Sequence, residues 1–158
     1  MESITTHFGA DHDRLDALFT EFQSLKRKDP AAAKEKFKGF LKGLTRHIVW
    51  EEEVLFPLFE QRTGMKDSGP TAVMRLEHRQ IGAHLDAIHE KVRVADPESD
   101  ASEKALLQIL KEHNMKEERM LYPAIDTGLD QDGLASVQKA MDAIPEERYA
   151  CCCHAHAH

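Results

Sequence analysis

The stretch His47-Ile-Val-Trp-Glu51-Glu-Glu-Val-Leu-Phe-Pro57 occurs a second time, in altered form, as His113-Asn-Met-Lys-Glu117-Glu-Arg-Met-Leu-Tyr-Pro123. Each copy is preceded, 35 positions before its histidine, by a further histidine that follows a carboxylate residue, in the pairs Asp11-His12 and Glu77-His78. The whole second copy is displaced from the first by 66 residues. A match at one fixed offset over this length indicates an internal duplication.

The spacing of the histidines fits a pair of antiparallel helices in each copy. Helix breaks at Asp29-Pro30 and at Ala95-Asp96-Pro97 lie about midway between the two histidines of their copy. An α-helix rises about 1.5 Å per residue, so a chain that turns at this midpoint returns to the level of its first histidine. We therefore predict an all-α protein with an up-down antiparallel four-helix bundle.

Apolar residues at helical spacing predict four long helices and a short fifth helix. The expected ranges are 3–28, 30–62, 70–94, 102–126 and 132–143. Pro57 and Pro123 each remove a backbone hydrogen bond, so we expect a kink in the second and fourth helices. The fifth helix is expected to cover one end of the bundle. We expect residues 1–145 to form this bundle and residues 146–158 to form a flexible Cys/His-rich tail.

Composition narrows the class of protein. The net charge of −7 and the lack of a basic stripe argue against nucleic acid as a partner. No apolar run approaches the ~20 residues of a membrane span. The first residues, Met1-Glu-Ser-Ile-Thr-Thr6, lack the pattern of a signal peptide, so we expect a cytoplasmic protein. The three cysteines are consecutive, which is not the pattern of a disulfide framework.

The repeated motif predicts a metal centre. In each copy the second histidine and the glutamate four positions later share one helix face, at places where the period calls for apolar residues. Burying a glutamate costs several kcal/mol unless it is paired or bound to a cation. One such pair alone is typical of a helix surface, but two copies at the same offset are not. We predict six ligands for two metal ions: His12, His47, Glu51, His78, His113 and Glu117.

The donor types indicate which metal these residues would hold. Mixed nitrogen and oxygen donors favour iron or manganese over a structural zinc site, which is rich in thiolate. Glu52 and Glu118 follow the predicted glutamate ligands and turn about 100° away. We expect them to be solvated or to lie outside the ligand set. His7 and His84 are left open as extra ligands.

Three other features can be explained either by packing or chain composition alone or by a role in function. Trp50 and Tyr122 are interpreted as packing residues, although Tyr122 lies close to Glu117 in the sequence. The segment Cys151–His158 combines thiols and imidazoles, so it is a candidate Cu or Zn site. The alternative is an extension without a role in metal binding.

These motifs resemble the hemerythrin-like family, also called the HHE cation-binding domain, over roughly residues 3–127. The resemblance implies an up-down four-helix bundle around a non-haem di-iron centre with an oxo or hydroxo bridge. It implies terminal histidine ligands and bridging glutamates at Glu51 and Glu117. Oxygen-carrying members have a fifth histidine where this chain has Gly82, which argues against reversible O2 transport. The resemblance favours the wider family, which handles oxygen, nitric oxide or peroxide, or senses iron.

Three functions remain open from the sequence. The first is a di-iron protein that binds, senses or reduces a small oxidant, namely O2, peroxide or nitric oxide. The second is metal storage, sensing or delivery that uses both the bundle site and the tail. The third is a structural metal in a bundle whose surface binds a partner. The sequence does not distinguish binding from catalysis, and no helix shows a second apolar stripe that would predict an oligomeric state.

Overall fold

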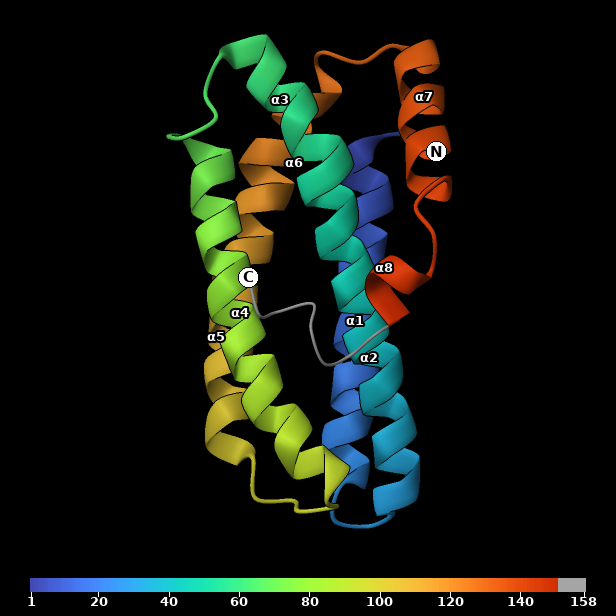
Figure 1. The fold of residues 1–158 in the computed structure, drawn as a ribbon, viewed down its shortest axis with the longest axis vertical. Helices are drawn as coiled ribbons and strands as arrows, with labels where there is room; N and C mark the ends of the chain where they lie inside the picture. Colours follow the sequence, from blue (N-terminus) through green and yellow to red (C-terminus); the bar gives the residue numbers. More distant parts are fainter. Residues whose placement is uncertain (151–158) are drawn as a thin grey trace.

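The computed structural model describes residues 1–150. Within this range the chain is helical and contains no strand, which confirms the all-α prediction. Four long helices, α1 (Ile4–Leu25), α2 (Pro30–Trp50), α4 (Pro70–Arg93) and α5 (Asp100–Lys116), run along the long axis of the molecule, and the chain reverses direction between successive ones (Figure 1). The predicted Cu or Zn site at Cys151–His158 lies outside the described residues and stays a prediction.

Local sequence explains where the long helices begin. The side chain of Asp29 accepts a hydrogen bond from the backbone N–H of Ala32 at 3.1 Å, and Pro30 occupies the first turn of α2, where its missing N–H costs nothing. The hydroxyl of Ser3 accepts from the N–H of Thr6 in the same way at the start of α1. Asp29 and Pro30 thus place the turn between α1 and α2 at the midpoint that the histidine spacing requires.

We predicted a kink at a proline in the second and fourth long helices, and the structure instead has a wider helical turn just before each proline. A π-helical turn, η1 (Glu51–Leu55), separates α2 from α3 (Phe56–Thr63), and η2 (Glu117–Leu121) separates α5 from α6 (Tyr122–Asp126). The N–H of the residue that follows each turn bonds to the carbonyl five residues earlier, that of the glutamate. A proline without an N–H comes next in both copies. Such π turns are frequent at functional sites.

Two apolar clusters fill the bundle and leave a polar layer between them. The lower cluster lies between the histidines and the end of the bundle where α1 turns into α2 and α4 turns into α5. It contains, among others, Phe19, Phe37, Leu85 and Leu106. The upper cluster lies between the histidines and the opposite end of the bundle. It contains, among others, Phe8, Phe56, Met74 and Tyr122. Along each long helix, the predicted ligands come between a member of one cluster and a member of the other. Packing on both sides therefore fixes the level of the polar layer.

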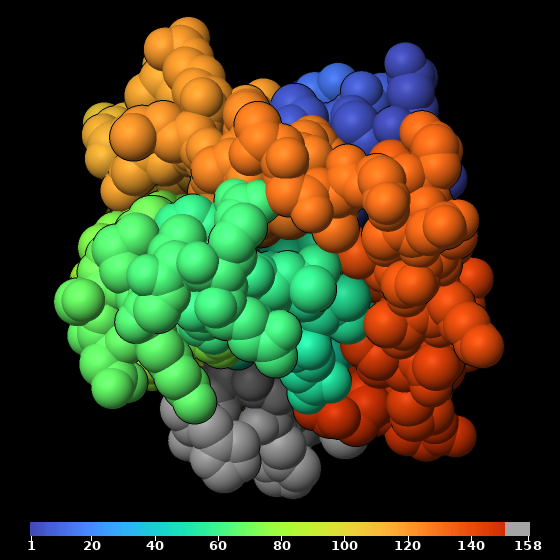
Figure 2. Space-filling view, turned by 90° about the horizontal axis from the view of Figure 1, so that it is seen from above, coloured from blue at the N-terminus to red at the C-terminus, as the bar shows by residue number. Residues whose placement is uncertain are grey.

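Shorter elements close the upper end of the bundle. Seen from above, α3, α6 and α7 (Gln131–Asp142) spread over this end beside the start of α1 (Figure 2). The buried face of α7, formed by Leu134, Val137 and Met141, joins the upper cluster, as expected for a covering fifth helix.

A short helix, α8 (Glu147–Ala150), follows α7 and lies against the side of the bundle. Arg148 of this helix pairs with Glu53, and Glu146 just before it pairs with Lys42. The domain boundary at residue 145 stays a prediction. No helix within residues 1–150 is both long and apolar enough to cross a membrane.

Candidate metal centre

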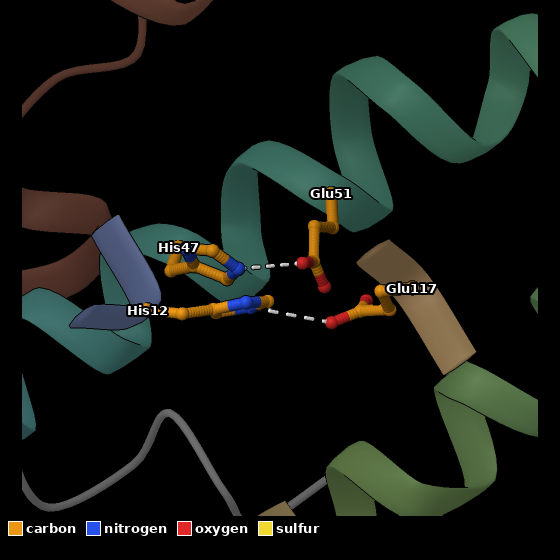
Figure 3. A group of neighbouring side chains, drawn as sticks. All are labelled: His12, His47, Glu51 and Glu117. Atoms are coloured by element: carbon orange, nitrogen blue, oxygen red, sulfur yellow. Dashed lines mark ion pairs between the residues drawn. The ribbon is translucent and has the colours of Figure 1, made fainter. Parts of the chain in front are cut away.

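Six side chains converge in the polar layer, and they are the six that the duplicated motif predicts. They form two groups in which one potential ligand atom per residue lies within 4.8 Å of the others. The first group contains His12, His47, Glu51 and Glu117, and the second contains His78, His113 and the same two glutamates. Figure 3 shows the imidazoles of the first group pointing toward the two carboxylates.

Each glutamate reaches across the bundle to histidines of both groups. The Oε1 atom of Glu51 lies 2.7 Å from Nε2 of His47, and its Oε2 atom lies 3.0 Å from Nε2 of His78. Glu117 Oε1 lies 3.4 Å from Nε2 of His12 and 3.2 Å from Nε2 of His113. Both carboxylates therefore stand between the two groups, in the place that a bridging ligand needs.

Several polar atoms of this cluster lack a hydrogen bond from any of the residues 1–150. They are Glu51 Oε2, His78 Nε2, His113 Nδ1 and both carboxylate oxygens of Glu117, and some of them make ion-pair contacts without a hydrogen bond. Glu51 and Glu117 are both 0% exposed, so water does not satisfy them from outside. A buried group without a partner costs about 1–3 kcal/mol, and more when it is charged. Nitrogen and carboxylate donors that face one another without a hydrogen bond fit a pair of cations such as iron or manganese.

A carboxylate stands behind each histidine, on the side away from the centre. Nδ1 of His12 lies 2.6 Å from Glu118 Oε1, and Nδ1 of His78 lies 3.0 Å from Glu52 Oε1. These two contacts are related by the 66-residue offset and cross between the halves of the chain. We expected Glu52 and Glu118 to lie outside the ligand set, and this geometry agrees with that expectation.

The other two histidines have carboxylate partners that the sequence reasoning missed. Nδ1 of His47 lies 2.9 Å from Asp11 Oδ2, within hydrogen-bonding distance. Nδ1 of His113 lies 3.6 Å from Glu77 Oε2, too far for a hydrogen bond, and has no hydrogen-bond partner within residues 1–150. The signal was present, because a carboxylate precedes the first histidine in both copies. An outer partner within hydrogen-bonding distance, such as Asp11, fixes the tautomer and the orientation of a ligating imidazole, so that Nε2 faces the metal.

The histidines and glutamates form an ion-pair network when no metal is bound. Burial disfavours the charge on His47, but Glu51 and Asp11 outweigh this effect and raise its pKa to about 10. For His78 burial is likewise outweighed, by Glu51 and Glu52, and its pKa rises to about 9. Against the effect of its own burial, these two histidines hold the pKa of Glu51 well below the usual range. Metal ions that bind here must therefore displace protons.

Tyr122 is a polar member of the cluster that the sequence reasoning took for a packing residue. Its hydroxyl donates a hydrogen bond of 2.5 Å to Glu51 Oε1 and lies 3.2 Å from Nε2 of His47. Burial, together with the charges of Glu117 and Glu51, raises the pKa of this hydroxyl well above its usual value. The available signals were its closeness to Glu117 in the sequence and the change from Phe56 to Tyr122 between the two copies.

His7 and His84, which the sequence left open, belong to neither metal-ligand group among the described residues. The ring of His7 packs beside Phe8 and Trp50, with centroid distances of 5.6 and 6.2 Å. Burial is the main effect on His7 and lowers its pKa. Within residues 1–150, the geometry gives neither histidine a place beside the six convergent side chains.

Comparison with known proteins gives a family and a set of relatives. The family model described as the Hemerythrin HHE cation binding domain matches residues 3–125. Proteins named iron-sulfur cluster repair protein YtfE, from Yersinia pestis (strain Pestoides F) and Yersinia pseudotuberculosis serotype O:1b (strain IP 31758), are 30% identical over 103 residues. The match covers 60% of this chain and 47% of each relative, so the chain spans about half the length of these relatives. No solved structure matches the chain.

Proposed function

The chain belongs to the hemerythrin HHE cation-binding domain family, and from that premise we propose that it is a cytoplasmic non-haem di-iron protein that binds, senses or reduces a small oxidant. The candidate oxidants are O2, peroxide and nitric oxide. One observation carries this proposal: two fully buried glutamates each stand between histidines of both groups. That arrangement suits two metal ions held side by side better than one structural ion.

The proposal gives each residue of the cluster a task. His12 and His47 would hold one ion, and His78 and His113 would hold the other. Glu51 and Glu117 would bridge the pair, with an oxo or hydroxo group as a further bridge. Iron, when bound, would supply the change of oxidation state and the Lewis acidity that reactions of small oxidants need.

Side chains around the cluster support this task without touching the ions. The outer carboxylates Asp11, Glu52 and Glu118 each hold one imidazole in place. The apolar clusters above and below limit the access of water, which strengthens electrostatic interactions inside the site. A small, uncharged or singly charged molecule suits such an enclosed site better than a large substrate does.

The experiment that tests this function is optical. Protein purified without oxygen is loaded with Fe(II), and visible spectra are recorded before and after the addition of O2, peroxide or nitric oxide. We expect a new charge-transfer band with at least one of them. A control with Glu117→Gln should bind less iron and give no such band. Iron-loaded wild-type protein whose spectrum is unchanged by all three reagents would contradict an oxidant-reactive centre.

A second candidate function is iron handling for iron–sulfur clusters. The observation in its favour is the printed name of the relatives, iron-sulfur cluster repair protein, which match over 47% of their length. In this function the bundle would release iron to an acceptor rather than react with an oxidant. Incubation of iron-loaded protein with a cluster-free iron–sulfur protein, sulfide and a reductant tests it. Recovery of the cluster faster than with an equal amount of free iron would favour this candidate.

A further inference from the structure

The two halves of the centre differ in one aromatic ring. Phe56 and Tyr122 occupy equivalent places in the duplicated motif, 66 residues apart, and both are 0% exposed. The ring of Phe56 stacks on His78 with centroids 5.8 Å apart, and the ring of Tyr122 stacks on His12 with centroids 5.9 Å apart. The rings therefore stand in matching positions, and they differ by one hydroxyl group.

The hydroxyl of Tyr122 is directed at one half of the centre. It donates a hydrogen bond of 2.5 Å to Glu51 Oε1 and lies 3.2 Å from Nε2 of His47 and 3.4 Å from Nε2 of His12. Both imidazole nitrogens belong to the group that contains His12 and His47, and Glu51, which both groups share, has its Oε1 atom 2.7 Å from Nε2 of His47. Among residues 1–150, the group with His78 and His113 has the ring of Phe56 in the equivalent place, and that ring offers no donor atom.

We propose that the oxygen of Tyr122 is a seventh protein ligand, which binds the ion held by His12 and His47, and that a small exogenous ligand binds the ion held by His78 and His113. This inference rests on the proposed di-iron function. On binding a trivalent ion, the phenol releases its hydroxyl proton to the solvent, and the freed oxygen takes a coordination position. Gly82, one helical turn after His78, has no side chain that could bind the ion held by His78 and His113.

Asymmetry of this kind decides where the small ligand binds. A phenolate that takes a coordination position excludes a small anion from the same position. The ion beside Phe56 keeps that position for the small ligand, because an aromatic CH edge does not coordinate. Sequence duplication thus supplies two similar half-sites, and one oxygen atom makes them chemically unequal.

Two reciprocal substitutions test the inference. Wild type, Tyr122→Phe and Phe56→Tyr are loaded with Fe(III), the bound iron is counted, and resonance Raman spectra are recorded in the visible range. We expect tyrosinate ring modes in the wild type, which require direct bonding of the phenolate to Fe(III). Tyr122→Phe should lose these modes and keep two irons per chain. Tyrosinate modes that persist unchanged in Tyr122→Phe, or that are missing from diferric wild type, would overturn the proposal.

Azide, a small anion, reports on the open position. We expect wild type to bind one azide per chain and Tyr122→Phe to bind two, because the substitution frees a position on the first ion. Phe56→Tyr should weaken azide binding at least tenfold, since the new hydroxyl takes the second position. Azide affinity in Phe56→Tyr equal to that of wild type would also overturn the proposal.

The iron count tells the two possible failures apart. Fewer than two irons in the wild type would refute the di-iron function itself, whereas two irons without a Tyr122-dependent signal would refute this inference alone.

Discussion

Glu51 and Glu117 each stand between histidines of both groups, so we expect a single substitution at either to weaken the binding of both ions. Glu51→Gln keeps the shape of the side chain and removes the negative charge that faces His47 and His78. We expect iron affinity to fall by more than the roughly 10–100-fold that is usual for an outer partner of a ligand. Iron counted after dialysis against graded chelator measures this loss.

Two further variants calibrate that loss. Glu118→Gln removes the outer partner of His12 and should cost roughly 10–100-fold in iron affinity. Glu53→Gln, two positions after Glu51 and on the surface, should leave iron binding unchanged. Equal affinity in Glu51→Gln and Glu53→Gln would contradict a bridging role for Glu51.

The raised pKa values of His47 and His78 predict a pH dependence for the metal-free protein. Their folded values, about 10 and about 9, lie above the ordinary value of 6.5, so their protonation favours the folded state. This contribution is complete below about pH 6.5 and is lost as the pH rises through about 9 to 10. Urea unfolding in the presence of chelator should show a free energy of unfolding that falls over this interval. His78→Gln should flatten the curve, and a stability that rises with pH would contradict the assigned ion pairs.

The residues of the centre show what the sequence could and could not reveal. The six convergent side chains follow from the 66-residue offset, because duplication marks them against a background of single histidines and glutamates. The hydroxyl of Tyr122 was not recognised, because a tyrosine that follows an apolar leucine on a helix is more often a core residue. Only the fold places its oxygen beside Glu51 and His47.

Substitutions in α4 can separate the contribution of apolar packing to stability from the binding of metal. Leu85 lies in the lower apolar cluster and is 0% exposed, whereas Leu76 on the same helix is 49% exposed. Leu85→Ala should lower the free energy of unfolding by roughly 2–5 kcal/mol. Leu76→Ala should change it by no more than about 0.5 kcal/mol. Both variants should keep the iron content of the wild type at a temperature where they are folded; loss of iron from folded Leu85→Ala would contradict the separation.

The helical elements were predictable because long apolar stripes and proline breaks have strong local signals. The π turns at η1 and η2 were not, since one extra residue in a single turn changes the apolar period too little to detect. The prolines at 57 and 123 indicated a disturbance of the helix but not its form. The two turns begin at Glu51 and Glu117, so the departure from a regular helix coincides with the cluster of predicted ligands.

For the whole molecule, bound metal should stabilise the bundle. The two glutamates sit at the junction of four helices, and ions that neutralise them bind the folded chain in preference to the unfolded one. A ligand at about 100 times its Kd adds about 2.7 kcal/mol to the free energy of unfolding. Calorimetry should therefore show a higher melting temperature with iron than with chelator. Identical melting temperatures under the two conditions would contradict specific binding in the core.

The arrangement of the whole chain followed from the sequence less completely than its helices did. The midpoint turns predicted that the chain reverses between histidines, and Figure 1 shows four long helices that reverse in this way. The packing of Arg148 of α8 against Glu53 was not foreseen, because residues 146–150 carry no apolar stripe.

The most direct test is an anaerobic titration of the metal-free protein with Fe(II), with bound iron counted per chain and the helical fold followed by circular dichroism. Because the two four-residue groups share Glu51 and Glu117, the wild type should saturate at two irons. Glu117→Gln should bind fewer than two while it stays helical. Saturation of a fully helical wild type at one iron or none would contradict a two-metal centre.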